Sequence, residues 1–442
     1  MRVCRRPLLP AVFSGPRRSG KATLALLLAL PALLLAMSLA FYAAELVETR
    51  TLLRNDADAA ALAGVQTFVD DYLLRNDPNR MKELIPLARQ NCQQYAGLNL
   101  VQGQGMYLDP NPTNDEDGDI VVGTLTYPRS KEFILPNLMT SLDPNWLNIN
   151  TVRVTGRRSA QHPNGPVQLH NGLLLSRSPN DVEAVSTATL DRFVIGFRPM
   201  GRQPLPLCPL ALFSFLPGSL KHCWEYNIEK RRGDDSYKVR RNGPYYEILK
   251  GRDRLHEMDV FLGAGEEMGQ MLKASRSDLN MQLRQGKFNC CLLYFGSSQV
   301  RDLLPQIVNG VDASHLSAFG GQLVLGPGNQ LLVNGTPWGP LNTSWDGQLL
   351  QSALQQLQSS GVPRLWPCFS CFDKETSNPV LCGFVAARVV QVKQRSGRGG
   401  SVTFTVQPCM MSTGTAVTDI GRAGIGTAKL PNPYICKVRL VE

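Results

Sequence analysis

Cysteines are the residues of this chain best equipped for chemistry. Eleven are present, and the segment Trp366 to Cys371 spaces Cys368 and Cys371 as Cys-x-x-Cys. In thiol oxidoreductases such a pair lies at the N-terminus of a helix that follows a strand, which lowers the thiol pKa. Here Pro379 and strand-like residues follow, and this favours structural bridging over catalysis. A zinc site built from Cys368, Cys371 and Cys382 lacks a convincing fourth ligand.

The acidic loop from Thr113 to Ile120 is the best metal candidate. Asp115 and Asp117 match the third and fifth positions of a calcium-binding EF-hand loop. The first position is Thr113 and the twelfth is Thr124, so two principal oxygen donors are missing. We therefore predict a solvated turn at this loop.

Other motifs also fall short of a site. His256 and Glu257 have no second histidine at the zinc-protease spacing, where Val260 stands instead. The segment Asp312 to Ser317 resembles the metal-adhesion motif of von Willebrand A domains, but its second serine is one residue late. We predict no catalytic residue, no cofactor-binding residue and no metal ligand, and we expect a protein without enzymatic activity.

A membrane segment precedes all of these motifs. Ala22 to Ala44 contains 23 residues without a charge, enough for a helix of roughly 34 Å that spans a bilayer core. Residues 1–21 form a basic tail without an acidic residue, and Glu45 and Glu48 follow the apolar run. Because positive charge stays on the cytoplasmic side, we expect the tail inside and the large C-terminal region outside.

A cleaved signal peptide is the alternative for this segment. Ser38, Leu39 and Ala40 offer small residues at the spacing that a signal peptidase prefers. The apolar run is longer than a usual signal core, and helix-favouring sequence continues past it, so we expect retention as an anchor.

Net charge does not indicate nucleic acid. The chain carries +10, but the tail alone contributes +6, which leaves 40 basic and 36 acidic residues outside. This balance lacks the basic surface of a nucleic-acid-binding protein. Outside the cytoplasm, cysteines form disulfides, and we expect them here among Cys92, Cys208, Cys223, Cys290, Cys291, Cys368, Cys371, Cys382, Cys409 and Cys436.

Hydrophobic periodicity predicts an α+β protein whose N-terminal transmembrane helix continues into a helical stalk, followed by a strand-rich extracytoplasmic region. The predicted parts are a tail (1–21), a transmembrane helix (22–44), a helical stalk (45–97), a β-rich unit (98–200), a mixed α/β unit (201–361) and a C-terminal β-rich unit (362–442). Within the stalk we expect a helix to about residue 75 and a second over 81–95. Residues 256–274 are predicted as a helix, and residues 322–335 as a hairpin about Gly326 to Asn329.

One stretch of the stalk resembles a known family. Leu30 and Pro31 lie inside the apolar run, and about 25 residues later stand Asn55, Asp58, Ala59, Ala60, Ala61, Leu62, Ala63 and Gly64. This order is similar to the N-terminal module of TadE/TadG-like pilus-assembly proteins of the tight-adherence (Flp) system. Asp56 stands where that family usually has alanine. The resemblance covers roughly residues 20 to 66 and implies a bacterial inner-membrane protein with a helical stalk and pilus-assembly partners.

The expected function is therefore that of a single-pass envelope protein, an assembly or scaffold component of a Tad/Flp-like pilus or cell-surface structure. Two alternatives stay open: a membrane-anchored surface-binding or adhesion module, and a thiol oxidoreductase that uses Cys368 and Cys371. The small residues Ala60, Ala61, Ala63 and Gly64 would let a second helix approach closely. Whether that helix belongs to a partner or to the chain itself is open at this level.

Overall fold

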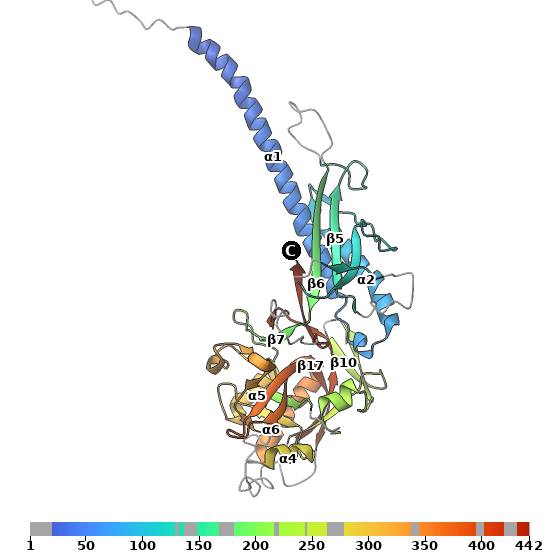
Figure 1. Cartoon of the computed structure of the whole chain (residues 1–442), viewed down its shortest axis with the longest axis vertical. Helices are drawn as coiled ribbons and strands as arrows, with labels where there is room; N and C mark the ends of the chain where they lie inside the picture. The colour runs from blue at the N-terminus through green and yellow to red at the C-terminus, as the bar shows by residue number, and fades with distance from the viewer. Residues whose placement is uncertain are drawn as a thin grey trace, which may run out of the picture. The chain divides into compact units, whose positions relative to one another are not determined.

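The computed structural model describes residues 20–128, 132–136, 148–167, 181–215, 221–243, 245–262, 278–336, 344–394, 402–419 and 431–441. The basic tail lies outside these residues. The chain forms two compact units: one contains Met1–Leu53 and Arg157–Glu183, the other Arg54–Gly156 and Ala184–Glu442. Long helices and a strand-rich remainder confirm the α+β class (Figure 1).

The predicted apolar helix is present. Helix α1 (Gly20–Gln66) runs through Pro31 without a break. In the described part of the chain, α1 is the one helix long and apolar enough to cross a membrane. Its apolar side chains between Leu26 and Phe41 are exposed, as expected of residues that face lipid. A membrane anchor and a signal sequence share these properties.

The stalk differs from the prediction in where its first helix ends. Helix α1 stops at Gln66, and a separate 3-10 turn, η1 (Asp71–Arg75), is followed by α2 (Pro78–Leu98). The Asp70 carboxylate caps η1 by accepting from Tyr72 N, and Asp77 caps α2 by accepting from Asn79 N. The first predicted helix is therefore divided into α1 and the capped turn η1, and the second corresponds to α2.

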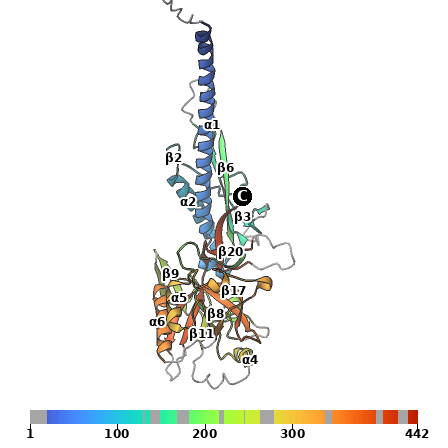
Figure 2. The same ribbon diagram turned by 90° about the vertical axis from the view of Figure 1, so that its left-hand side faces the viewer.

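A six-stranded sheet lies beside α2. Its strands are ordered β19 (Met411–Ser412), β21 (Ile435–Val441), β6 (Val182–Asp191), β5 (Thr151–Arg158), β3 (Ile120–Leu125) and β4 (Phe133–Ile134). Strands β3, β5 and β6 lie in the range 98–200 that the sequence presents as β-rich, and β21 lies in the β-rich range 362–442. The C-terminal strand β21 pairs antiparallel with β6, so the end of the chain joins the sheet of the first β-rich range (Figure 2).

An eight-stranded sheet forms the main core. Along its path lie β11 (Met258–Leu262), β18 (Val402–Pro408), β17 (Pro379–Gln394), β16 (Arg364–Phe372), β8 (Leu210–Phe213), β12 (Cys290–Leu293) and β15 (Gly335–Thr336), and β14 (Leu331–Leu332) pairs with β17. Helix α6 (Ser344–Ser360) packs on β17 and on α5 (Val300–Asn309). A short helix, α4 (Asp278–Arg284), contacts β16. Strands from both of the ranges 201–361 and 362–442 thus share one sheet.

The helix predicted over residues 256–274 is wrong in its described part, where β11 stands. Met258, Val260 and Leu262 alternate as buried residues along this strand. Between them, Asp259 accepts hydrogen bonds from Lys393 Nζ and from Thr405 on the adjacent strand β18. A period of two with a paired carboxylate fits a strand, and the apolar spacing was misread as helical. Residues 263–274 lie outside the described part.

The predicted hairpin over 322–335 is also wrong. A turn does form, with η6 (Pro327–Asn329) and a hydrogen bond from Gly326 N to Gln330 O. Its two arms pair elsewhere. Strand β13 (Leu323–Val324) pairs with β7 (Val194–Phe197), which also pairs with β20 (Ala416–Thr418), and β14 pairs with β17.

Two further hairpins form separate two-stranded sheets: β1 (Leu100–Val101) with β2 (Gln104–Gly105), and β9 (Tyr237–Asn242) with β10 (Tyr245–Lys250). The short turns η3 (Glu225–Glu229) and η5 (Ser317–Phe319) complete the described elements.

Candidate functional site

The residues that carry the family resemblance divide between two environments. Leu30 is exposed in the first half of α1, and Pro31 lies in the same stretch. The later part of the motif belongs to the C-terminal end of α1, where Ala57, Ala60 and Ala61 are completely buried. Asn55 is exposed and Asp58, Ala59, Leu62 and Ala63 are half-buried, with Arg54 Nε 3.3 Å from Asp58 Oδ1.

The closest approach in this module is at Gly64. A Cβ atom added to Gly64 would lie 2.3 Å from Cys92 Sγ on α2 and 3.3 Å from Val152 Cγ1 on β5. One turn later, Asn91 on α2 donates a hydrogen bond to Thr67 Oγ1 at 2.8 Å. The small residues of the motif therefore pack against the chain's own second helix and sheet. This contact answers the question left open by the sequence: the second helix is α2.

Asp56, which departs from the family pattern, is buried within this module at 1 % exposure. Burial raises the pKa of Asp56 to about 7, and the Asn99 side chain opposes this by favouring the charged form. A buried carboxyl with so little compensation is destabilising. The structure gives no reason for an aspartate at this position.

An ion pair joins the η1 turn to the main sheet. Arg388 on β17 places Nη1 2.6 Å from Asp71 Oδ2, and Asp71 Oδ1 accepts from Met410 N at 2.7 Å. Arg388 is 4 % exposed and stacks over the Tyr246 ring. Because the Asp71 and Cys409 groups favour the charged form more than burial opposes it, the pKa of Arg388 is raised.

Two cavities flank η1, and Leu255 and Met410 line both. The first, of about 410 Å³, contains the Asp71–Arg388 pair together with Asp253. Asp253 Oδ2 lies 3.9 Å from Arg75 Nη2, and burial raises the pKa of Asp253 to about 6. We call this the paired-charge cavity, since its acidic and basic side chains face each other.

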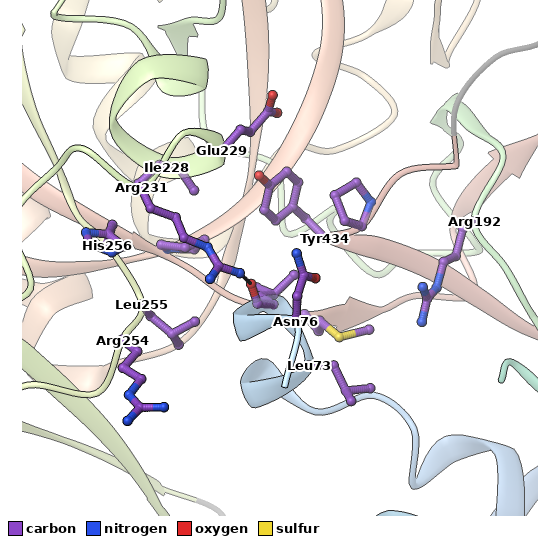
Figure 3. Close-up of a pocket in the computed structure, with 14 residues that line it drawn as sticks. Leu73, Asn76, Arg192, Ile228, Glu229, Arg231, Arg254, Leu255, His256 and Tyr434 are labelled. Atoms are coloured by element: carbon purple, nitrogen blue, oxygen red, sulfur yellow. Dashed lines mark hydrogen bonds between the residues drawn. The ribbon is translucent and has the colours of Figure 1, made fainter. Parts of the chain in front are cut away.

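The second cavity, of about 240 Å³, has a different charge balance. Its charged and titratable lining consists of Arg192, Arg231, Arg254, His256 and Glu229, and we call it the cationic cavity (Figure 3). Arg192 follows β6, Arg231 follows η3, and Arg254 and His256 precede β11. The chain thus brings these side chains together from three separate segments. The sequence analysis did not single out these residues, since no local motif links the three segments.

Hydrogen bonds in the cationic cavity are few. Arg231 donates from Nη2 to Leu74 O at 3.4 Å, the dashed contact of Figure 3, and His256 Nδ1 lies 2.8 Å from Gly233 O. Arg192 Nε is buried and has no hydrogen-bond partner in the part of the chain that the structure describes. Burial lowers the pKa of Arg192. Figure 3 shows the Glu229 carboxylate directed away from the three guanidinium groups.

The expectation of disulfides finds no support. The ten described cysteines form no disulfide with one another, and eight of them are buried. Burial raises the pKa of Cys92, Cys208 and Cys409 to about 12 and holds that of Cys290, Cys291 and Cys368 well above the ordinary thiol value. These thiols therefore pack as small apolar side chains in the core. Cys4 lies outside the described residues.

The Cys-x-x-Cys pair lies within strand β16, not at the N-terminus of a helix. Cys382 on β17 donates weakly from its thiol to Cys368 O at 3.5 Å. A buried thiol with a raised pKa provides little thiolate for attack. The oxidoreductase alternative thus gains nothing from this geometry.

The acidic loop forms the predicted turn. Asn111 Nδ2 donates to Asp115 O and Ile120 O, and Thr113 Oγ1 donates to Asp115 Oδ2. Asn114 bonds to Val122 through both its amide oxygen and its amide nitrogen. Side-chain amides and hydroxyls thus organise the loop. In the described residues no group of three or more potential ligands is placed to hold a metal ion.

Comparison with known proteins gives no further assignment: no family model matches this chain, and no curated protein or solved structure matches it either.

Proposed function

We propose that this chain is a single-pass envelope protein that serves as a non-enzymatic assembly or scaffold component of a Tad/Flp-like pilus or related cell-surface structure. In this proposal the apolar part of α1 is retained in the bacterial inner membrane. The basic tail is cytoplasmic, and the large C-terminal region that follows the apolar run is extracytoplasmic. The resemblance of residues 20 to 66 to TadE/TadG-like proteins supports the family role.

The observation that carries the proposal is an apolar stripe on α2. Leu87, Tyr95 and Leu98 are 43 %, 48 % and 69 % exposed. At 100° per residue these positions fall within about 80° of one another. The buried Leu84 and the half-buried Asn91 fall in the same sector, so the most exposed apolar side chains lie at the C-terminal end of α2, at Tyr95 and Leu98. Leu100, which begins β1 just beyond the helix, is 62 % exposed. A group of exposed large apolar residues on one face is typical of a protein-binding surface.

This assignment places the partner surface on the outer face of α2. The motif residues at the end of α1 already contact α2 and β5 through Gly64, so they support the domain from within. In this proposal the motif and the partner surface have separate roles: the motif residues stabilise the packing of the domain, and the exposed face of α2 binds the partner.

Site-specific photo-crosslinking tests the proposal. A photoreactive phenylalanine analogue at position 98 of the full-length chain, expressed in its own host, should crosslink to pilus-assembly proteins. The same analogue at Ser298, an exposed position just before α5, is the control and should give no such product. Leu87→Ser with Leu98→Ser should abolish co-purification of those proteins and surface assembly while thermal unfolding is unchanged. Crosslinks that do not differ between positions 98 and 298, or normal assembly by the double variant, would refute it.

A further inference from the structure

The cationic cavity carries an excess of positive charge. Arg192, Arg231 and Arg254 contribute three guanidinium groups, and Glu229 is the one carboxylate in the described lining. No ion pair is recorded between Glu229 and any of these arginines in the described part. Three guanidinium groups and one carboxylate give the described lining a formal charge of +2, with histidine counted as neutral as in the net charge of the chain.

The paired-charge cavity shows what this chain does when such charges are satisfied internally. There, Arg388 is held by Asp71 at 2.6 Å. Among the residues that the structure describes, Arg192 has no carboxylate in a comparable position, and its Nε, like that of Arg388, is buried without a hydrogen bond. Arg192 as a whole is half-buried on the cavity wall. A ligand that supplies negative charge in the cavity would give this guanidinium a charged hydrogen-bond partner.

Backbone conformation gives a second indication. Arg231 and Arg254 on the cavity wall have φ values of 54° and 65°. Asn76, which also lines the cavity and has a φ of 53°, ends η1 and is an ordinary cap in this conformation. Residues other than glycine and asparagine adopt this left-handed region at a cost of about 1 kcal/mol each. Strained residues of this kind concentrate at ligand sites.

We propose that the cationic cavity is a binding site for a small phosphate monoester. Guanidinium groups donate paired hydrogen bonds to phosphate oxygens, and a dianion neutralises a lining of +2 where a monocarboxylate would neutralise half of it. The volume of about 240 Å³ lies below that of cavities for drug-sized molecules. Leu73 and Met410 on its wall give the uncharged part of the ester an apolar surface.

Calorimetric titration of the purified full-length chain in a neutral detergent tests this site. The probes are inorganic phosphate and glycerol phosphate, with acetate at equal ionic strength as the control anion. Both phosphates should bind, and acetate should not. Arg192→Gln should weaken phosphate binding at least about tenfold. Arg240→Gln removes the same charge from an exposed position on β9 and should change the affinity less than about twofold.

A second variant protects the test against misfolding. Arg254 is exposed at the cavity rim, so Arg254→Gln should fold normally and still weaken phosphate binding. Absence of phosphate binding by the unaltered chain, or equal losses in Arg240→Gln and Arg254→Gln, would overturn the proposal. Dihexanoyl phosphatidic acid distinguishes the source of the phosphate. Tighter binding than glycerol phosphate indicates a lipid headgroup, and equal or weaker binding indicates a soluble ester.

Discussion

Asp71 Oδ2 lies 2.6 Å from Arg388 Nη1, and these two residues are 317 positions apart in the chain. Asp71 begins the 3-10 turn that follows α1, and Arg388 lies in the longest strand of the main sheet. The turn that follows α1 is therefore joined to the main sheet by an ion pair whose arginine is buried and whose aspartate is half-buried.

Loss of one member of this pair should destabilise the protein. Asp71→Asn leaves the Arg388 guanidinium buried without a counter-charge, and we expect a loss of about 2–4 kcal/mol in the free energy of unfolding. Asp71→Asn combined with Arg388→Met should be more stable than Asp71→Asn alone. Urea unfolding of the unaltered chain, the two single variants and the double variant gives the free energies of unfolding for a double-mutant cycle. Additive losses would mean that the pair contributes no coupling.

The close contact at Gly64 gives a second prediction. Gly64→Ala places a methyl group against Cys92 Sγ, and overpacking of this kind should reduce stability by about 1–3 kcal/mol. Cys92→Ala removes the obstructing sulfur and should restore part of the loss in the double variant. Gly97→Ala, where an added Cβ meets nothing within 4 Å, is the matched control and should be neutral or stabilising. Thermal unfolding midpoints measure all four proteins, and equal effects at positions 64 and 97 would argue against the observed packing.

Glu257 predicts how stability depends on pH. It is 3 % exposed, and burial raises its pKa from 4.5 to about 7. A carboxyl with a raised pKa in the folded state stabilises the protein below its unfolded pKa, and this contribution is lost as pH rises through the folded pKa. Stability should therefore fall between about pH 4.5 and pH 7, by about 2 kcal/mol after allowance for solvent screening.

Glu257→Gln isolates this effect. Its Oε1 can still accept from Ser236 N and Tyr237 N, as Glu257 Oε1 does at 3.0 and 2.6 Å, but it no longer ionises. The difference in unfolding free energy between the variant and the unaltered chain should therefore grow in favour of glutamine as pH rises from 4.5 to 7. A difference that is constant over this range would show that Glu257 does not titrate there.

Thiol labelling tests the description of the cysteines. Under native conditions at pH 8, iodoacetamide should modify the half-buried Cys371 and Cys382 first, because the remaining described cysteines are buried. In denaturant without reductant, all ten should react. Mass spectrometry of the alkylated peptides reports each position. Cysteines that react in denaturant only after reduction would establish the disulfides that the sequence led us to expect.

Sequence patterns located single elements well and their partners poorly. The alternation of Val152 and Val154 with Arg153 predicted a strand, and β5 is there. No local pattern could show that β21 at the end of the chain pairs with β6, since pairing over such a separation is set by the packing of the whole core. The hairpin predicted near Gly326 is wrong for the same reason, because both of its arms pair with strands that are distant in the sequence.

The candidate sites show the same difference between single residues, which the sequence reveals, and contacts between distant segments, which it does not. The small residues from Ala57 to Gly64 were visible in the sequence, but their contact with Cys92 was not. Arg192, Arg231 and Arg254 come from segments that only the fold brings to one cavity. The one local signal was the run of basic residues near Arg231, and charge alone could not distinguish a cavity wall from a solvated loop.

The central claim is that α1 holds an intact extracytoplasmic protein in the membrane. Alkaline carbonate extraction of cells that express the full-length chain with a C-terminal tag tests it most directly, combined with protease treatment of spheroplasts. The account predicts a tagged chain of about 49 kDa in the membrane pellet, whose C-terminal region is digested from outside in intact spheroplasts. A tagged chain released into the soluble fraction and shortened by cleavage near Ala40, or one protected from external protease, would contradict it.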